Sequence, residues 1–191
     1  MKTQKVKDLM VPLSEYATVP ETATLLEAVK ALKKAQAAFS KQRYRHRAIL
    51  VIDDNNHFVG KLSQHDVVEA LEPNYKEMRR QSQDGSIHRL GLSDAFFQKT
   101  LEQYHLWEHA LEGLCRKAND LKVKRVMYTP DKGEFVKENA TMDEAIHRLI
   151  VGRHHSLLVT ADRDPREIVG VLRLSDVFEF VGDSMLECEL V

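Results

Sequence analysis

VGKLSQHD at residues 59–66 and VGVLRLSD at residues 169–176 are two copies of one short pattern. Both copies keep a glycine that is followed six residues later by an aspartate. An apolar run precedes each copy, AILV at residues 48–51 and SLLV at residues 156–159. Order and spacing are rarely preserved together by chance, so the chain contains an internal duplication.

Two further blocks recur upstream of these copies, again in the same order. Residues 6–10 (VKDLM) are echoed by residues 123–127 (VKRVM), and residues 23–29 (ATLLEAV) are echoed by residues 140–146 (ATMDEAI). The duplication therefore spans most of both ends of the chain. It predicts two copies of one structural unit, in residues 1–71 and in residues 123–191.

Each copy has the signals of a β-α-β-β-α unit. Thr24 with Glu27, and Thr141 with Glu144, have the spacing of a capping box, in which a hydroxyl and a carboxylate bind free N–H groups at a helix start. Apolar residues follow both boxes at helical spacing. The continuous apolar run at residues 48–52 is typical of a strand that is buried on both faces.

The stretch between the copies, residues 72–122, is too long and too patterned to be a loop. Residues 93–119 are predicted to form one helix with a broad apolar face, which needs a partner surface in its own chain or in another subunit. We predict that this face contributes to a homodimer and that Trp107 is its anchor. The face comprises Phe96, Phe97, Leu101, Tyr104, Trp107, Leu111 and Leu114.

Composition excludes several classes of protein. With 43% hydrophobic and 30% charged residues, the chain has the balance of a soluble globular protein and too much apolar content for disorder. A formal net charge of −1 gives no overall attraction to nucleic acid or to an anionic membrane. The sequence offers no membrane-spanning run and no signal peptide, and its two cysteines form no CxxC motif, so we expect a cytoplasmic protein.

The ordered blocks, occurring twice, resemble a tandem pair of CBS domains, the Bateman module. The resemblance covers residues 5–71 and 123–182 and leaves out the central segment. It implies an α+β fold in which two β-α-β-β-α repeats pack sheet to sheet about a pseudo-two-fold axis, with a long helical insert here between them. It also implies two related clefts and assembly into a homodimer.

The resemblance implies a function as well, namely regulation by an adenosine nucleotide such as AMP, ADP or ATP, with no enzymatic activity and no cofactor. Asp66 and Asp176 would hold ribose hydroxyls, and Ser63 would meet a phosphate. In the second copy Arg173 replaces the hydroxyl residue, so the usual geometry is in doubt there, and Arg173 is itself a candidate to contact a phosphate directly. The alternative interpretation of both aspartates is helix N-capping. Binding would change the conformation of an unidentified regulated protein.

Basic triplets precede the second strand of each copy, Arg45-His46-Arg47 and Arg153-His154-His155. The resemblance implies that they meet phosphates, and cationic side chains that converge on one place suit a polyphosphate. The alternative is a solvated basic loop. Backbone near the first strand of each copy would read the adenine; these positions are Ala17, Thr18 and Val19, and Phe135, Val136 and Lys137.

One rival motif lies in the central segment. His105 and His109 belong to an H-x-x-E-H string, which places two histidines on one helix face, as zinc requires. The same residues fit a solvent-facing polar stripe, and an insert this short is no peptidase domain. We therefore expect no metal site, and His105 and His109 are the only candidates for metal ligands. The leading hypothesis is a nucleotide sensor, and the alternative is a ligand-free structural or dimerisation module.

Overall fold

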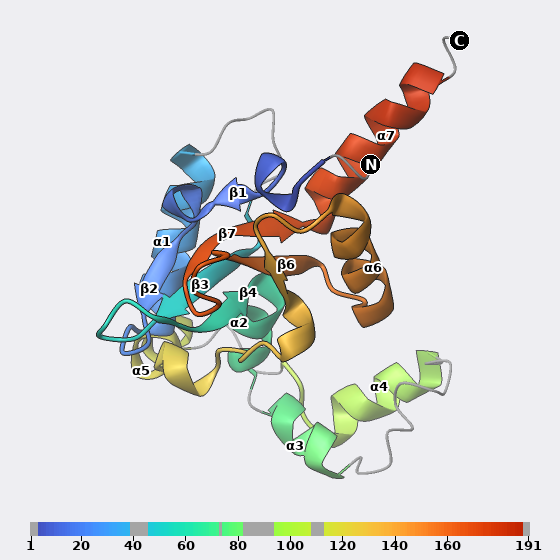
Figure 1. Ribbon diagram of the computed structural model, residues 1–191. Helices are drawn as coiled ribbons and strands as arrows, with labels where there is room; N and C mark the ends of the chain where they lie inside the picture. The colour runs from blue at the N-terminus through green and yellow to red at the C-terminus, as the bar shows by residue number, and fades with distance from the viewer. Residues whose placement is uncertain (1–3, 39–45, 73, 82–93, 108–112, 189–191) are drawn as a thin grey trace.

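The computed structural model describes residues 4–38, 46–72, 74–81, 94–107 and 113–188. Two β-α-β-β-α repeats are present, as predicted, and Figure 1 shows them side by side. The first repeat comprises β2 (Thr18–Pro20), α1 (Leu25–Ala38), β3 (Ala48–Ile52), β4 (Phe58–Ser63) and α2 (Gln64–Ala70). The second comprises β5 (Phe135–Lys137), α6 (Met142–Gly152), β6 (Ser156–Thr160), β7 (Ile168–Arg173) and α7 (Leu174–Cys188).

The predicted buried strand is central in each repeat. β3 pairs in parallel with β2 and antiparallel with β4, and β6 pairs in the same way with β5 and β7. Equivalent residues occupy equivalent registers, since Thr18 lies opposite Leu50 in one sheet and Phe135 lies opposite Leu158 in the other. The two sheets are therefore comparable position by position.

The segments that lead into the repeats are exchanged between them. β1 (Val11–Pro12) pairs with β7 of the second repeat. In return, Tyr128, from the segment that leads into the second repeat, exchanges two backbone hydrogen bonds of 2.8 and 2.9 Å with Lys61 in the sheet of the first repeat. Val6, in the short helix η1 (Val6–Asp8), joins the core of the second repeat, and Val123, in η4 (Val123–Arg125), joins the core of the first. Each core is completed by the other repeat's leading segment.

This exchange explains why the valine-glycine pattern and the methionine of VKxxM recur together. A Cβ atom on Gly170 would lie 2.6 Å from the carbonyl oxygen of Val11 and 2.8 Å from Sδ of Met10. In the other sheet, a Cβ atom on Gly60 would lie 2.8 Å from Sδ of Met127. Glycine is required in both strands because the exchanged segment approaches so closely.

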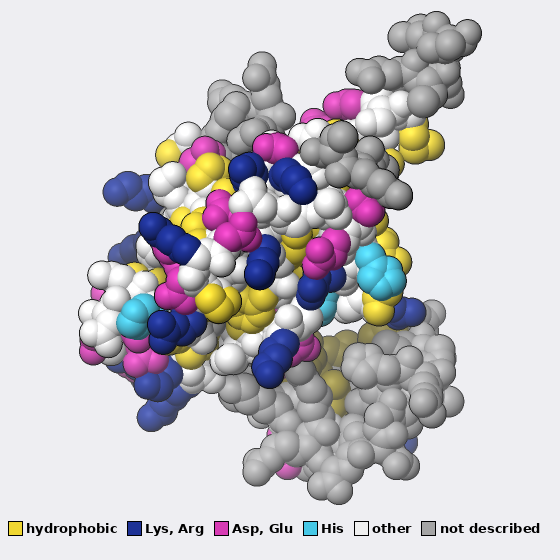
Figure 2. Space-filling model, in the orientation of Figure 1, with side chains coloured by type: hydrophobic (Ala, Val, Ile, Leu, Met, Phe, Trp, Pro, Cys, Tyr) yellow, Lys and Arg dark blue, Asp and Glu magenta, His cyan; other side chains and the backbone are white. Residues whose placement is uncertain are grey.

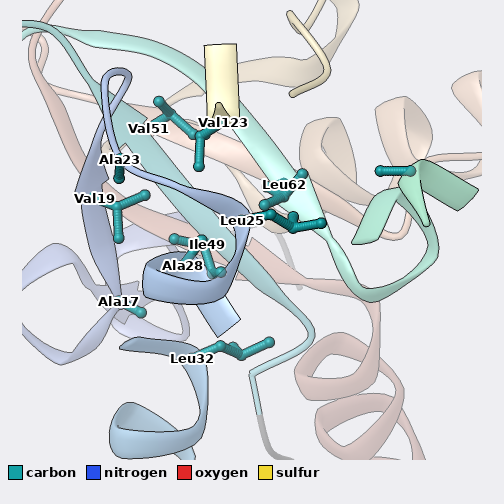
Figure 3. Close-up of a cluster of buried hydrophobic side chains, with 11 residues drawn as sticks. Ala17, Val19, Ala23, Leu25, Ala28, Leu32, Ile49, Val51, Leu62 and Val123 are labelled. Atoms are coloured by element: carbon teal, nitrogen blue, oxygen red, sulfur yellow. The ribbon is translucent and has the colours of Figure 1, made fainter. Parts of the chain in front are cut away.

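Three clusters of buried side chains hold the molecule together. One lies under α1 (Figure 3) and comprises Ala17, Val19, Ala23, Leu25, Ala28, Leu32, Ile49, Val51, Leu62, Ala70 and Val123. An equivalent cluster in the second repeat comprises Val6, Val136, Met142, Ala145, Leu149, Leu157, Val159, Leu172 and Val177. The third joins the two sheets through Val11, Tyr16, Leu50, Leu158, Ile168 and Val171, as expected for repeats packed sheet to sheet.

Only one of the two predicted capping boxes forms. The Thr24 hydroxyl accepts from the Glu27 N–H at 3.2 Å, and the Glu27 carboxylate accepts from the Thr24 N–H at 2.7 Å. At α6 the prediction was wrong, since the Thr141 side chain caps nothing. Glu144 instead pairs with Arg148 at 2.9 Å, one turn further along. The corresponding position in α1 is Ala31, which offers Glu27 no such partner.

The insert is helical, but its single long helix was a wrong prediction. The described helices are α3 (Asn74–Gln81), α4 (Asp94–Gln103) and α5 (Leu114–Asp120). A turn follows α4, where His105 and Trp107 have left-handed backbones with φ of 50° and 65°. Trp107 is held there because its backbone N–H donates to Glu72 at 3.0 Å and its indole N–H donates to Tyr75 at 2.9 Å. Leu111 and His109 lie outside the described residues.

Charges of both signs are interspersed on the face shown in Figure 2, in keeping with the near-zero net charge. None of the helices that the structure describes is long and apolar enough to cross a membrane. Within the same residues, no group of three or more His, Cys, Asp or Glu side chains is placed to hold a metal ion. His105 is exposed and lies in the turn after α4.

Candidate functional site

Asp176 is in the first turn of α7, and Arg173 ends the strand before it. Nε of Arg173 donates to Oδ2 of Asp176 at 2.6 Å, and Nη2 donates to Oδ1 at 2.5 Å. The side chains are only 7% and 12% exposed. Both carboxylate oxygens are thus engaged by one guanidinium in a buried two-pronged ion pair, the strongest form of this contact.

Two aromatic side chains of the first repeat complete this group. The rings of Tyr16 and His46 lie 4.4 Å apart, and both side chains are buried. Burial raises the pKa of Tyr16 to about 12, an effect that Arg173 opposes and Asp176 reinforces. Burial, followed by the Arg173 charge, lowers the pKa of His46. We call Tyr16, His46, Arg173 and Asp176 the Asp176 cluster.

Asp66 occupies the equivalent position in the first repeat but has different neighbours. Its Oδ2 accepts from the N–H and the hydroxyl of Ser63, both at 2.7 Å, and its own N–H donates to the Ser63 hydroxyl at 3.2 Å. Ser63 is therefore the N-cap residue of α2, and Asp66 shares in the capping box as the third helical residue rather than as the N-cap itself. Oδ1 of Asp66 has no hydrogen-bond partner in the described part of the chain, and the residue is half-buried. One oxygen remains available to a ligand.

A charged pair from the two repeats lies beside Asp66. Lys61 of β4 forms an ion pair with Glu134, which is 2% exposed. Nζ of Lys61 also lies 5.3 Å from the centre of the Tyr128 ring. A hydrogen bond to Glu134 is the main cause that raises the pKa of Tyr128 to about 12, and Asp66 adds to it. We call Lys61, Ser63, Asp66, Tyr128 and Glu134 the Asp66 cluster.

The other predicted ligand residues are spread around these clusters. Ala17, Val19 and Val136 are buried, and the Ala17 carbonyl is already bound by the Leu50 N–H at 2.9 Å. Side chains that solvent reaches belong to Thr18, Arg47, His154 and His155. Sequence reasoning missed Tyr16, Lys61, Tyr128 and Glu134. No motif marks them, since Lys61 and Glu134 are 73 residues apart and meet only through the packing of the repeats.

Two cavities have linings that include no residue of either cluster. One of about 440 Å³ is lined by residues around β5 and the start of α6, including Val136, Lys137 and Arg148. The other, of about 680 Å³, lies between the β3–β4 and β6–β7 turns and is lined by residues such as Phe58 and Ile168. Phe135, Val136 and Lys137, all three predicted to read the adenine, line the first cavity, and the remaining predicted ligand residues that the structure describes line neither.

The repeat architecture and its exchanged leading segments agree with a family comparison. The model of the CBS domain matches residues 6–73 and 123–183. The chain belongs to the CBS domain family. Its two CBS domains correspond to the two repeats, with the helical insert between them. A comparison with curated proteins finds no match.

Solved CBS-domain structures share this fold at low sequence identity. A CBS domain-containing protein of unknown function from Bacillus anthracis is 17% identical, with 95% of each chain covered and a TM-score of 0.59. CBSX2 in complex with AMP is 16% identical, with 95% of this chain and 98% of that chain covered and a TM-score of 0.56. The CBS domain of a bacterial CNNM/CorC family Mg²⁺ transporter in complex with ATP is 14% identical, with 93% and 87% covered and a TM-score of 0.56.

Proposed function

We propose that this CBS-domain pair is a regulatory module that binds an adenine nucleotide at the Asp66 cluster. The observation that carries the proposal is the state of the Asp66 carboxylate. Ser63 holds Oδ2 in place while Oδ1 is left without a partner in a half-buried setting. A fixed carboxylate with a free acceptor suits a ribose hydroxyl, because a hydrogen bond to a charged acceptor is worth about 1.5–3 kcal/mol.

Neighbouring residues are proposed to contact the base and the phosphates of the nucleotide. The Tyr128 ring is 43% exposed and offers a flat face for a base. Arg47, His154 and His155 are reachable by solvent and are proposed phosphate contacts, which would make binding sensitive to salt. The backbone of Val136 is proposed for the adenine end at Asp66. The equivalent residues Ala17, Thr18 and Val19 follow Tyr16 and lie on the side of the Asp176 cluster.

Regulation follows from where the cluster lies. Lys61 and Asp66 belong to the first repeat, whereas Tyr128 and Glu134 come from the second. A ligand that contacts both repeats favours one arrangement of them over another, and a bound protein can respond to that shift. Two of the similar structures are complexes with AMP and with ATP, which supports an adenine nucleotide as the ligand class.

Calorimetry with AMP, ADP and ATP tests the proposal, with GTP as the control for the base. We expect heat with at least one adenine nucleotide and weaker or no heat with GTP. A matching rise in melting temperature should appear, because a ligand that binds only the folded state stabilises it by mass action. No heat from any adenine nucleotide at millimolar concentration would refute this function.

The alternative is a structural or dimerisation module without a ligand, and one surface observation favours it. Ile150 and Val151 on α6 and Phe178 on α7 are 65–70% exposed, although all three are large apolar residues. Figure 1 shows these two helices on the same side of the molecule. Exposed apolar side chains that gather on one side suit an interface with a second copy.

A further inference from the structure

The two aspartates occupy one position in the repeat, yet their neighbours differ in size and charge. Asp66 has Ser63 three residues before it, whereas Asp176 has Arg173. A second difference lies two residues before the first strand of each repeat. The position that Tyr16 holds before β2 is held by Gly133 before β5. In both comparisons the bulky residue belongs to the Asp176 cluster.

Arg173 occupies the two carboxylate oxygens of Asp176 that a ligand's hydroxyl groups would need as hydrogen-bond acceptors. It engages both oxygens of Asp176, at 2.5 and 2.6 Å, and is itself 6% exposed. A neutral ribose hydroxyl would have to displace a buried cation from a buried anion, which leaves a guanidinium without its charged partner. That exchange is unfavourable, because breaking a buried ion pair costs far more than one neutral hydrogen bond returns.

Tyr16 closes the same position from the other repeat. Its ring packs on the fully buried His46, with the ring centres 4.4 Å apart. In the first repeat's counterpart, Gly133 has no side chain of its own, and a Cβ atom added to it would lie 3.0 Å from Oδ1 of Asp131 and 3.6 Å from Nε2 of the half-buried His154. No ring stands at the position that Tyr16 occupies in the other repeat. One position thus holds the bulky Arg173 and Tyr16, whereas the equivalent residues at the other are the smaller Ser63 and Gly133.

We propose that Arg173 is a built-in occupant of the Asp176 position, so that the chain takes one nucleotide, at Asp66. This inference rests on the proposed function. It makes the two halves of a duplicated protein unequal: one keeps the ligand position, and the other has converted it into an internal ion pair that joins Arg173, Asp176 and the aromatic pair of the first repeat.

Exchanging the residues at the two positions tests this directly. Wild-type protein should bind one ATP per chain by calorimetry. Ser63→Arg should abolish binding, because the new guanidinium would close onto Asp66. The matched control Ser63→Met removes the hydroxyl without adding a cation, and should weaken binding only about ten-fold. Arg173→Ser should open the second position and give two ATP per chain.

The double variant Ser63→Arg with Arg173→Ser should move the single site from the first repeat to the second. Two ATP per chain in the wild type would overturn the inference and leave the proposed function intact. Binding of none of AMP, ADP and ATP, in the wild type or in Arg173→Ser, would refute the proposed function itself. A folded Arg173→Ser variant that still binds one ATP would also overturn the inference.

A second measurement needs no ligand and does not depend on Arg173→Ser folding. In ¹⁵N-labelled protein the Nε–H of Arg173 should exchange slowly with water, because it is buried and bound to Asp176. Asp176→Asn should speed this exchange, and the exposed Arg125 serves as the reference for an unprotected guanidinium. Exchange at Arg173 as fast as at Arg125 would show that the position is open and would overturn the inference.

Discussion

Asp66 combines two roles that the sequence left as alternatives, since it caps α2 and still has a free oxygen. We expect Asp66→Ala to weaken nucleotide binding by about 1.5–3 kcal/mol, the scale of a hydrogen bond to a charged group. Calorimetry with the best-binding adenine nucleotide measures the loss. The control is Thr24→Ala, which removes a cap from α1 at a cost of about 1 kcal/mol in stability. Equal affinities for both variants would place the ligand away from Asp66.

His46 gives the protein a predictable response to acid. Burial is the first cause that lowers its pKa in the folded state below the ordinary value of 6.5, and the Arg173 charge is the second. Since the unfolded chain then takes up the proton more readily, the free energy of unfolding should be full above pH 6.5 and fall as the pH drops below it. The slope for one proton is at most about 1.4 kcal/mol per pH unit.

Denaturant titrations between pH 7.5 and pH 5 measure this slope. His46→Phe should flatten it, whereas His147→Gln, a change at an exposed histidine, should leave it as in the wild type. A slope that survives in His46→Phe would assign the response to another group.

At the residue scale, the sequence predicts interactions between residues close in the chain better than it predicts contacts between the two repeats. The pattern of Thr24 and Glu27 predicted the cap of α1 because a capping box is a local interaction. The same approach failed at Thr141, where Arg148 competes for Glu144 one turn away. Contacts between the repeats, such as Lys61 with Glu134, could not be predicted, since they depend on how two sheets pack.

At the scale of the elements, the exchanged leading segments set the tolerance of each glycine, β1 with Met10 at Gly170 and residues 127–128 at Gly60. A Cβ atom on Gly170 would lie only 2.6 Å from the backbone oxygen of Val11. One on Gly60 would lie 2.8 Å from the flexible Sδ of Met127 and 3.0 Å from the backbone oxygen of Tyr128, so its backbone contact is less severe. We expect Gly170→Ala to cost about 1–3 kcal/mol in unfolding free energy, and Gly60→Ala to cost less.

The matched control is Gly182 in α7, which has no atom within 4 Å of an added Cβ. Gly182→Ala should stabilise the protein by up to about 1 kcal/mol, because alanine favours the helix. Chemical denaturation of the three variants gives the order. A Gly170→Ala protein as stable as the wild type would mean that β1 can move away from β7 at no cost.

Elements within the repeats were predicted well, and the insert was not. Strand and helix patterns in the repeats are reinforced by burial on known faces, as at Leu25 and Ile49. Apolar spacing in the insert continued past Gln103, yet Glu72 and Tyr75 hold Trp107 in a turn. Apolar periodicity cannot reveal where this helix ends, because the residues that hold Trp107 in the turn lie in α3 and just before it, and not in the segment that carries the pattern.

For the whole molecule we expect a homodimer, with α6 and α7 as the main contact. Replacing Ile150 and Phe178 with glutamate should give monomers, because charges would enter an apolar interface. Sedimentation equilibrium at micromolar concentration measures the result. Changing Phe97 and Leu101 in α4, which are 48% and 38% exposed, is the control for the predicted contact through the insert. A monomeric wild type would contradict dimerisation altogether.

The exchanged leading segments also constrain how a ribosome can deliver this protein. The first repeat leaves the exit tunnel early, but its core lacks Val123, and the first N–H of α1 waits for the Leu121 carbonyl, which it binds at 2.8 Å. Residues as far as Tyr128 must be synthesised before the first sheet has all its partners. Folding in the usual order, with the N-terminal unit finished first, is therefore unavailable here. The first repeat therefore stays incompletely folded until most of the chain has been synthesised.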